Sequence, residues 1–450
     1  MTRLAVIGGG ITGLLASHKL QQHGHRVTVF EASDTPGGKI RGSEIAGMAV
    51  ADGPDAFLPR DEVPLELLRE FGLEETASPA VFGAYIWHGG RLRRLPAGSP
   101  YGIPCHPSEA WRAGLLSGPG AARAGLENLN RSVLSGPDVS VGAFIRARFG
   151  DEVLTNLVDP LLAGIRGGVA DEMSLSAGAK EIDVIARNNR SVLRTLRQRE
   201  PEAPRFIKPA GGIVAIIDAL AARMEDLRTS MPIQRLAIDG STTNLSTSSG
   251  SEAFDGVVLA CPTFAAAELL RDLDPHLARD LDSIRYASLA VITLVYPPGS
   301  FQVPQGGSGF LVPTASGLTI SACTWYSTKW PDVTSDGRQV VRCVIGRAGE
   351  DPSLEGDDEV LLSLVQRDLA VTMGLETPSV AHRVTRWERS IPQYRVGHVD
   401  LVASIEERLA ARGPIVVAGA GYRGSGIPDC IAQATAAART LAGLVPVGRG

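Results

Sequence analysis

The fold is decided by the stretch LAVIGGGITG at residues 4–13, which is followed by a helical pattern and then by the apolar segment VTVFE at residues 27–31. Three of its glycines, Gly8, Gly10 and Gly13, have the spacing G-x-G-x-x-G. The first glycine of this motif allows a tight turn, the second lets a pyrophosphate approach the backbone, and the third lets helix and strand pack closely. The N-terminus of the helix then favours a phosphate. The stretch therefore predicts a dinucleotide-binding strand–helix–strand unit.

An acidic residue closes the second strand of this unit. Glu31 lies where a carboxylate can bind both ribose hydroxyls of an adenosine, and it would repel the 2′-phosphate of NADP. The stretch PGGKIR at residues 36–41 follows, where a plain NAD dehydrogenase would normally begin another helix. It resembles the second glycine motif of FAD enzymes in the amine oxidase superfamily. A Pro-Gly-Gly turn is common in its own right, so this stretch favours FAD only together with the first motif.

The composition is typical of a globular protein with a large core. The 450 residues are 44% hydrophobic and 21% charged, which is enough for two or three domains. The formal net charge of -5 gives no general attraction to nucleic acid, so we expect no nucleic-acid partner. The five cysteines are far apart without a C-x-x-C pair, and the histidines lack metal-ligand spacing. We therefore expect no metal site and a reducing, cytoplasmic location.

The chain shows no segment that predicts export or membrane insertion. The first strand begins at Leu4, which leaves no room for a signal peptide. The longest apolar run, near residues 287–296, is shorter than the roughly 20 residues of a spanning helix. We expect no transmembrane segment, while peripheral membrane contact and the oligomeric state stay open.

The remainder of the chain alternates between helical and strand patterns. Residues 108–199 are mainly helical, and several strand patterns lie between residues 287 and 345. The polar run at residues 241–251 separates two strand patterns and is interpreted as a hairpin turn. A last apolar strand leads through the glycine-rich turn at residues 419–428 into a helix.

Three further motifs carry a resemblance to a known family. They are GPDAFL at residues 53–58, IPQY at residues 391–394 with Gly397-His398, and GAGYRGSGIPDCI at residues 419–431. Together with the first motif, they resemble the protoporphyrinogen and coproporphyrinogen oxidases, which are FAD-dependent enzymes of haem biosynthesis in the amine oxidase-like superfamily. The last two motifs, in this order, separate that family from general amine oxidases. The absence of a targeting segment favours its soluble bacterial branch.

The resemblance implies an α/β fold with a Rossmann-like FAD-binding domain that is discontinuous in sequence. The expected parts are residues 1–78, 205–265 and 382–450 for the FAD-binding domain, 79–204 for a mainly helical insert, and 266–381 for a sheet-based substrate domain. The positions expected to contact FAD are Gly8, Gly9, Gly10, Ile11, Thr12, Gly13, Glu31, Ala32, Lys39, Gly53, Pro54, Asp55, Ala56, Ile233, Ala420, Ser425, Gly426 and Ile427.

Substrate contacts are less clearly marked in the sequence. A porphyrinogen carries propionates, and Arg60 occupies a position after residues 53–55 that is often basic in the family. Gly168 matches a family glycine at which the substrate passes close to the backbone. The chain departs from the family at Val169, where an acid or amide is common, and at residues 96–104, which lack an arginine found in some relatives. Surface and turn roles explain Arg60 and Gly168 about equally well.

The implied reaction is the six-electron oxidation of coproporphyrinogen III to coproporphyrin III, with FAD as cofactor and molecular oxygen as acceptor. Protoporphyrinogen IX is the alternative substrate. Further alternatives are an amine oxidase-like enzyme, a carotenoid desaturase, and a flavin-binding scaffold without turnover. Positioning of the macrocycle on the flavin would supply most of the catalysis. The sequence therefore names no catalytic side chain.

Overall fold

The computed structural model describes residues 2–59, 61–78, 83–129, 136–198, 205–240, 242–349 and 352–446. Its first part is a five-stranded sheet in the order β19-β13-β1-β2-β9, in which all neighbouring strands are parallel. The strands are β1 (Arg3–Ile7), β2 (Arg26–Phe30), β9 (Asp226–Arg228), β13 (Gly256–Leu259) and β19 (Ile415–Val417). The predicted discontinuous α/β fold is thus confirmed.

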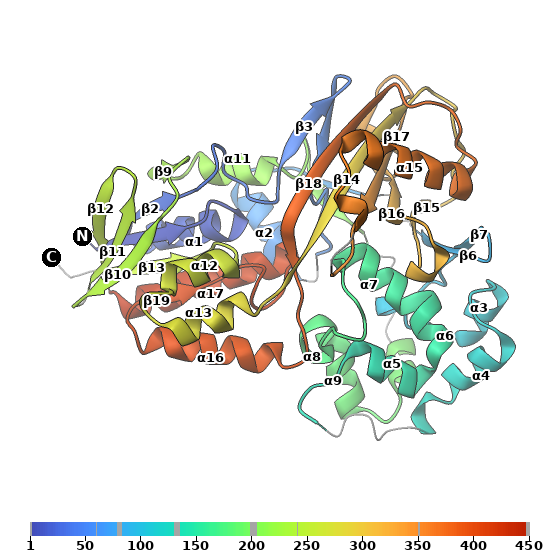
Figure 1. Ribbon diagram of the computed structural model, residues 1–450, viewed down its shortest axis with the longest axis horizontal. Coiled ribbons are helices and arrows are strands. Elements are labelled where there is room, and N and C mark those ends of the chain that lie inside the picture. The colour runs from blue at the N-terminus through green and yellow to red at the C-terminus, as the bar shows by residue number, and fades with distance from the viewer. Residues whose placement is uncertain are drawn as a thin grey trace.

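Helices cover both faces of this parallel sheet, at the left of Figure 1. One face packs on α1 (Ile11–Gln22), α2 (Val63–Glu70), α11 (Ala215–Ala221) and α17 (Ile427–Leu444), and the other on α12 (Thr263–Leu270), α13 (Pro275–Asp282) and α16 (His398–Ala410). In β1, Leu4 and Val6 enter the first core while Ala5 and Ile7 enter the second. This two-sided burial explains why the strand is an unbroken apolar run.

The polar run at residues 241–251 is not the predicted hairpin turn. It lies in a three-stranded antiparallel sheet of β10 (Arg235–Asp239), β11 (Thr242–Thr247) and β12 (Gly250–Phe254). Thr243 and Leu245 alternate inward and are each 1% exposed. The pattern was missed because serine and threonine are polar, so the alternation of inward and outward residues does not show as alternating hydrophobicity. Threonine is β-branched and favours strands.

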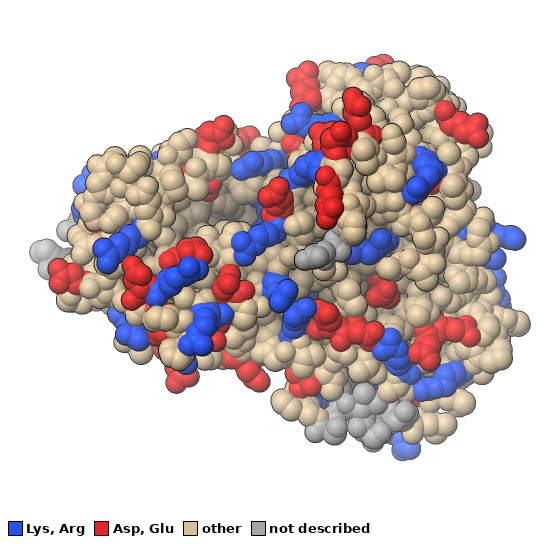
Figure 2. All heavy atoms as spheres, viewed as in Figure 1, with Lys and Arg blue, Asp and Glu red and all other residues tan. Residues whose placement is uncertain are grey.

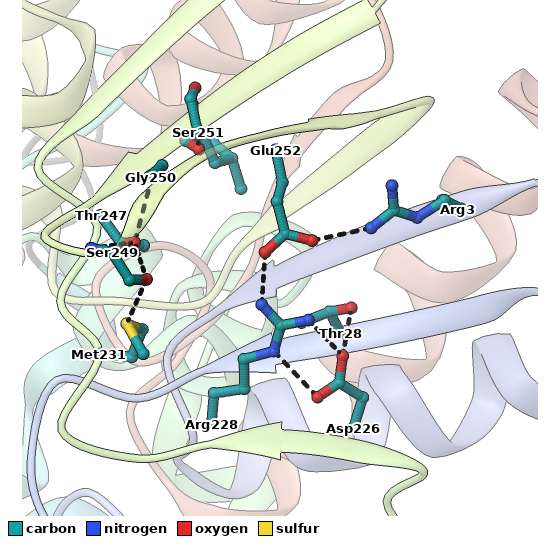
Figure 3. Close-up of polar contacts among 11 residues, drawn as sticks. Arg3, Thr28, Asp226, Arg228, Met231, Thr247, Ser249, Gly250, Ser251 and Glu252 are labelled. Carbon is teal, nitrogen blue, oxygen red and sulfur yellow. Dashed lines mark hydrogen bonds and ion pairs between the residues drawn. The ribbon is translucent and has the colours of Figure 1, made fainter.

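A network of charged side chains joins this small sheet to the parallel one (Figure 3). Glu252 of β12 accepts hydrogen bonds from Arg3 of β1 and from Arg228 of β9. Arg228 also donates two bonds to Asp226, which accepts a further one from Thr28 of β2. Since these groups are partly exposed, the network fixes the relative position of the strands more than it stabilises the fold.

The second part is a seven-stranded sheet in the order β18-β14-β17-β16-β15-β6-β7, antiparallel except where β15 meets β6. Its strands are β6 (Gly83–His88), β7 (Arg91–Arg94), β14 (Tyr286–Tyr296), β15 (Gly307–Leu311), β16 (Ile320–Trp325), β17 (Gln339–Ile345) and β18 (Ala381–Pro392). Helix α15 (Asp358–Met373) covers one face. In Figure 1 the long strands β14 and β18 run from this upper part toward the parallel sheet.

This pairing corrects three of the expected domain boundaries. Strands β6 and β7 belong to the seven-stranded sheet and not to a helical insert beginning at residue 79. Strand β18 pairs with β14, so the sheet continues past residue 381. Helix α13 packs on the parallel sheet although it falls within residues 266–381. Strand partners so distant in sequence leave no local trace in the pattern. The assignment of these parts to flavin and substrate remains a prediction.

The third part is mainly helical, as predicted, and lies at the lower right of Figure 1. It contains α3 (Pro107–Arg112), α4 (Gly118–Gly125), α5 (Val141–Phe149), α6 (Asp151–Val153), α7 (Asp159–Arg166), α8 (Leu175–Gly178), α9 (Lys180–Asn188) and α10 (Val192–Arg197). Inside its core Arg148 and Glu127, each 1% exposed, form an ion pair, and Ser191 donates to the same carboxylate.

Three further short units belong to the fold. They are the hairpin of β3 (Gly42–Ile45) and β4 (Met48–Ala51), the pair of β5 (Glu75–Ala77) and β8 (Ile207–Pro209), and helix α14 (Tyr326–Lys329). Across the described ranges, no helix is both long and apolar enough to cross a bilayer. On the described surface seen in Figure 2, cationic and anionic side chains are interspersed and not gathered by sign.

Candidate functional site

The first glycine motif forms a tight turn between β1 and α1 that only glycine can make. Gly8 has φ +113°, and a Cβ atom there would lie 2.8 Å from the Ala260 carbonyl oxygen. A Cβ on Gly13 would lie 1.9 Å from the Gly8 carbonyl oxygen. Both contacts are with backbone, which cannot move aside. These two glycines are therefore required by the fold itself.

Gly10 has a different environment. Its backbone, with φ −76° and ψ 175°, suits any residue, and the nearest atom to an added Cβ is the Gly37 carbonyl oxygen, 4.0 Å away. The first turn of α1, which includes Ile11 and Thr12, has neither a side-chain cap nor an acidic residue. Open space therefore lies before a helix N-terminus whose N–H groups are uncapped, which fits the pyrophosphate of a dinucleotide.

The carboxylate of Glu31 is held at the carboxyl end of β2. It accepts hydrogen bonds from the backbone N–H groups of Gly9, at 2.6 Å, and of Ser33, at 2.8 Å. Ala32 is exposed beside it, and the Glu31 carbonyl accepts from Met231 N–H at 2.9 Å. This bond brings the segment before β10, with partly buried Ile233, next to the acid. The residues predicted to contact adenosine thus lie together.

The glycine-rich turn near the C-terminus lies against the first turn of α1. A Cβ on Gly419 would be 3.9 Å from the Thr12 hydroxyl. The Tyr394 hydroxyl donates to the Ala420 carbonyl and accepts from Gly424 N–H at 3.1 Å. Two segments that are some 400 residues apart in the sequence therefore meet at one edge of the parallel sheet.

The N-terminus of α17 differs from that of α1. Gly426 N–H donates to the Asp429 carboxylate at 3.1 Å, so an acid of the first turn already satisfies it. The Ile427 side chain is buried in the core, and Ser425 is partly buried. The sequence predicted that the dipole of this helix end points at the flavin. The N-terminus of α17 has fewer free N–H donors for that role than the N-terminus of α1.

Lys39 follows the second glycine motif and is a cation in a buried setting. Its ammonium group lies 5.9 Å from the centre of the Tyr286 ring, and no carboxylate among the described residues pairs with it. Burial lowers the pKa of Lys39. The Tyr286 hydroxyl accepts from Thr263 N–H at 3.1 Å. A lone cation of this kind suits an anionic or electron-rich ligand.

The segment GPDA passes close to the second glycine motif. A Cβ on Gly53 would lie 2.1 Å from the Lys39 carbonyl oxygen, so the two backbones are in contact. The carboxylate of Asp55 accepts from Lys329 at 2.8 Å and from the Trp330 indole at 2.7 Å. One oxygen of this carboxylate, Oδ2, therefore already has two donors from the end of α14. Pro54 is exposed, and Ala56 packs against a small core cluster beside β3 and β4.

The two predicted substrate residues gain little from the structure. Arg60 lies outside the described residues. Gly168 is buried, and a Cβ there would meet the Met173 methyl at 2.6 Å and the Gln393 side-chain oxygen at 2.9 Å. Internal packing therefore accounts for this glycine, and its role toward a substrate stays a prediction.

Sequence reasoning missed four side chains at this site. Tyr286 directly precedes the apolar run at residues 287–296, Tyr394 belongs to the IPQY motif, and neither was assigned a contact. Arg342 of β17 and Lys329 of α14 contact residues 53–55. The IPQY motif could have singled out Tyr394. The other three carry no local signal, because their role depends on long-range strand pairing.

Comparisons with known proteins agree with this geometry. The profile of the family "Flavin containing amine oxidoreductase" matches residues 11–442. The chain is 31% identical over 455 residues to coproporphyrinogen III oxidase of Bacillus subtilis (strain 168), covering 96% of each protein, and 32% identical over 470 residues to the Staphylococcus aureus enzyme of that name, covering 97% of this chain and 98% of that enzyme. A crystal structure from Exiguobacterium sp. 255-15, named as a candidate protoporphyrinogen oxidase, superposes with a TM-score of 0.88 at 28% identity, covering 98% of each chain.

Proposed function

We propose that this chain, which belongs to the family of flavin-containing amine oxidoreductases, oxidises coproporphyrinogen III to coproporphyrin III. The chain is an FAD-dependent oxidoreductase of that family. The observation that supports the substrate is the near full-length similarity to bacterial enzymes of that name. The open space before α1 is the feature of the fold that suits FAD.

The residues of this chain would act by binding and orientation. Bound FAD would accept hydride from the substrate and pass electron pairs to an acceptor, which we propose to be oxygen. Three such pairs account for the six electrons between porphyrinogen and porphyrin. The N-terminus of α1 would hold the pyrophosphate, Glu31 the ribose, and the backbone at Gly53 and Lys39 the flavin ring. Arg60 would meet a propionate.

The substrate can be decided by turnover with two porphyrinogens side by side. We expect porphyrin fluorescence to rise faster with coproporphyrinogen III than with protoporphyrinogen IX, and oxygen to be consumed in proportion. The converse preference would support protoporphyrinogen oxidase, the name borne by a spinach relative at 27% identity and, as a candidate name, by the Exiguobacterium structure. Turnover of a simple amine with neither porphyrinogen oxidised would refute the haem assignment.

We also propose that the protein works in the cytoplasm. The five cysteines are free thiols, and four of them are buried. A reducing compartment keeps such thiols reduced. Cell fractionation with an antibody against the full chain would test this proposal.

A further inference from the structure

The segment at residues 52–55, which would run beside the flavin, is held by the seven-stranded sheet and by the end of α14. Arg342 of β17 donates to the Gly53 carbonyl at 2.6 Å, and the Trp387 indole of β18 donates to the Asp52 carbonyl at 3.0 Å. Lys329 and Trp330, at the end of α14, bind the Asp55 carboxylate. Side chains of β17 and β18 therefore hold the backbone of this segment, and the end of α14 holds its carboxylate.

This buried cluster carries more positive than negative charge. Lys329 and Arg342 are 7% and 8% exposed, and together they face one carboxylate, that of Asp55. Burial opposes ionisation of Asp55, but the charges of Lys329 and Arg342 outweigh it and hold its pKa well below the usual range. The cluster defined by Asp55, Lys329 and Arg342 therefore has a net charge of about +1.

The groups around the cluster do not remove that charge, since the buried Asp52 carboxylate has its own cation, Arg383, at 3.3 Å. Lys208 and Asp332 form a separate pair at 2.7 Å. Burial raises the pKa of Tyr326, whose ring lies under the Arg342 guanidinium, to about 12, so this phenol is neutral. A charge in such a poorly hydrated place acts over a longer distance than one in water.

We propose that Lys329 and Arg342 are positioning residues whose uncompensated charge, placed behind residues 53–55, stabilises the negative charge that flavin gains on reduction. The inference deepens the proposed function and rests on the flavin site assigned there. Asp55 has the opposite electrostatic effect, since it offsets one of the two cations. The cluster thus sets the reduction potential of the flavin while it holds the segment in place.

The test uses the FAD-loaded full chain without any porphyrinogen. The flavin would be reduced in equilibrium with a reference dye, for wild type and for Arg342→Met, Lys329→Met and Asp55→Asn. At an effective dielectric constant of about 20, one unit charge in a partly dehydrated site changes a charge-forming equilibrium by about an order of magnitude. We expect the reduction equilibrium to fall about tenfold in Arg342→Met and Lys329→Met, and to rise about tenfold in Asp55→Asn.

The opposite signs separate electrostatics from a merely structural role. Loosening of the segment would shift the three variants in one direction, whereas charge shifts Asp55→Asn against the other two. Arg342→Lys, which keeps the charge, should behave as wild type. The double variant Asp55→Asn with Lys329→Met has the same net cluster charge as wild type, and it should restore the wild-type potential even if Asp55→Asn alone does not fold.

Two results would overturn the inference: unchanged potentials in both cation variants, or a shift of the same sign in the double variant and in Lys329→Met. Neither result would touch the proposed function, because no porphyrinogen is present. Conversely, a flavin-loaded wild type that oxidises neither porphyrinogen would refute the proposed function and leave the potentials interpretable.

Discussion

Replacing Gly10 by valine should weaken flavin binding and leave the protein folded. The backbone at Gly10 has φ and ψ values open to any residue, and an added Cβ meets nothing nearer than 4.0 Å. Gly10 is the partly buried N-cap of α1, where valine is less favoured than glycine, so the apoprotein should lose about 1 kcal/mol of stability and stay folded. The branched side chain would instead fill the space before α1. Overpacking against the pyrophosphate should cost about 1–3 kcal/mol, which weakens FAD binding roughly 5- to 150-fold.

Gly13 supplies the matched control within the same motif. A Cβ on Gly13 would lie 1.9 Å from the Gly8 carbonyl oxygen and 3.1 Å from its carbon, so Gly13→Ala must distort the turn. Gly13→Ala should therefore destabilise the apoprotein by about 3 kcal/mol or more, whether or not flavin is present. Two glycines of one motif thus predict different phenotypes.

The assay has two readouts for each variant. Chemical denaturation of the apoprotein gives the free energy of unfolding, and titration with FAD gives the dissociation constant from flavin fluorescence quenching. Wild-type FAD affinity in Gly10→Val would refute the assigned pyrophosphate site. Unfolded Gly10→Val apoprotein would instead contradict the open space inferred before α1.

Three further outcomes are expected. Glu127→Gln should lower the free energy of unfolding by about 3–5 kcal/mol in urea denaturation, since it leaves Arg148 charged and buried, and a change below about 1 kcal/mol would contradict this. Burial alone would raise the pKa of Asp138, but hydrogen bonds, first that from Gly397 N–H, lower it overall. The stabilisation that the charged carboxylate gives is therefore present above about pH 3.9, the pKa of an unfolded aspartate, and is lost as the pH falls through the lower pKa of the folded state. The free energy of unfolding, measured from pH 7 to pH 3, should consequently depend less on pH in Asp138→Asn than in wild type. Tyr394→Phe should weaken FAD binding about tenfold, because about 1.5 kcal/mol of hydrogen bonding to the turn at residues 419–424 is lost. Equilibrium dialysis would measure the affinity, and an unchanged value would remove Tyr394 from the site.

Local patterns predicted the parts of this fold that depend on neighbouring residues. The glycine spacing at residues 8–13 and the apolar strand before it identified the dinucleotide unit, because both faces of β1 are buried. Strands β11 and β12 were missed because serine and threonine concealed a period-two pattern.

Distant pairings were beyond the reach of the sequence. Nothing in the pattern of β6 or β18 indicates that each joins the seven-stranded sheet. For the same reason the pairing of the Asp55 carboxylate with Lys329 could not be foreseen, and the cofactor contact expected at Asp55 stays a prediction. The glycines of the site could be predicted from a motif, but the charged groups behind it could not.

The strand order of the parallel sheet also determines when the protein can fold during synthesis. Strand β1 is central, yet its neighbour β13 begins at Gly256 and the edge strand β19 at Ile415. Helix α17, which packs on α1, is completed only at Leu444. Because these contacts span nearly the whole chain, the entropy cost of loop closure slows folding. The N-terminal unit therefore leaves its apolar surface exposed until the C-terminal elements have been synthesised. The strand order therefore makes folding of the protein dependent on chaperones and sensitive to truncation at the C-terminus.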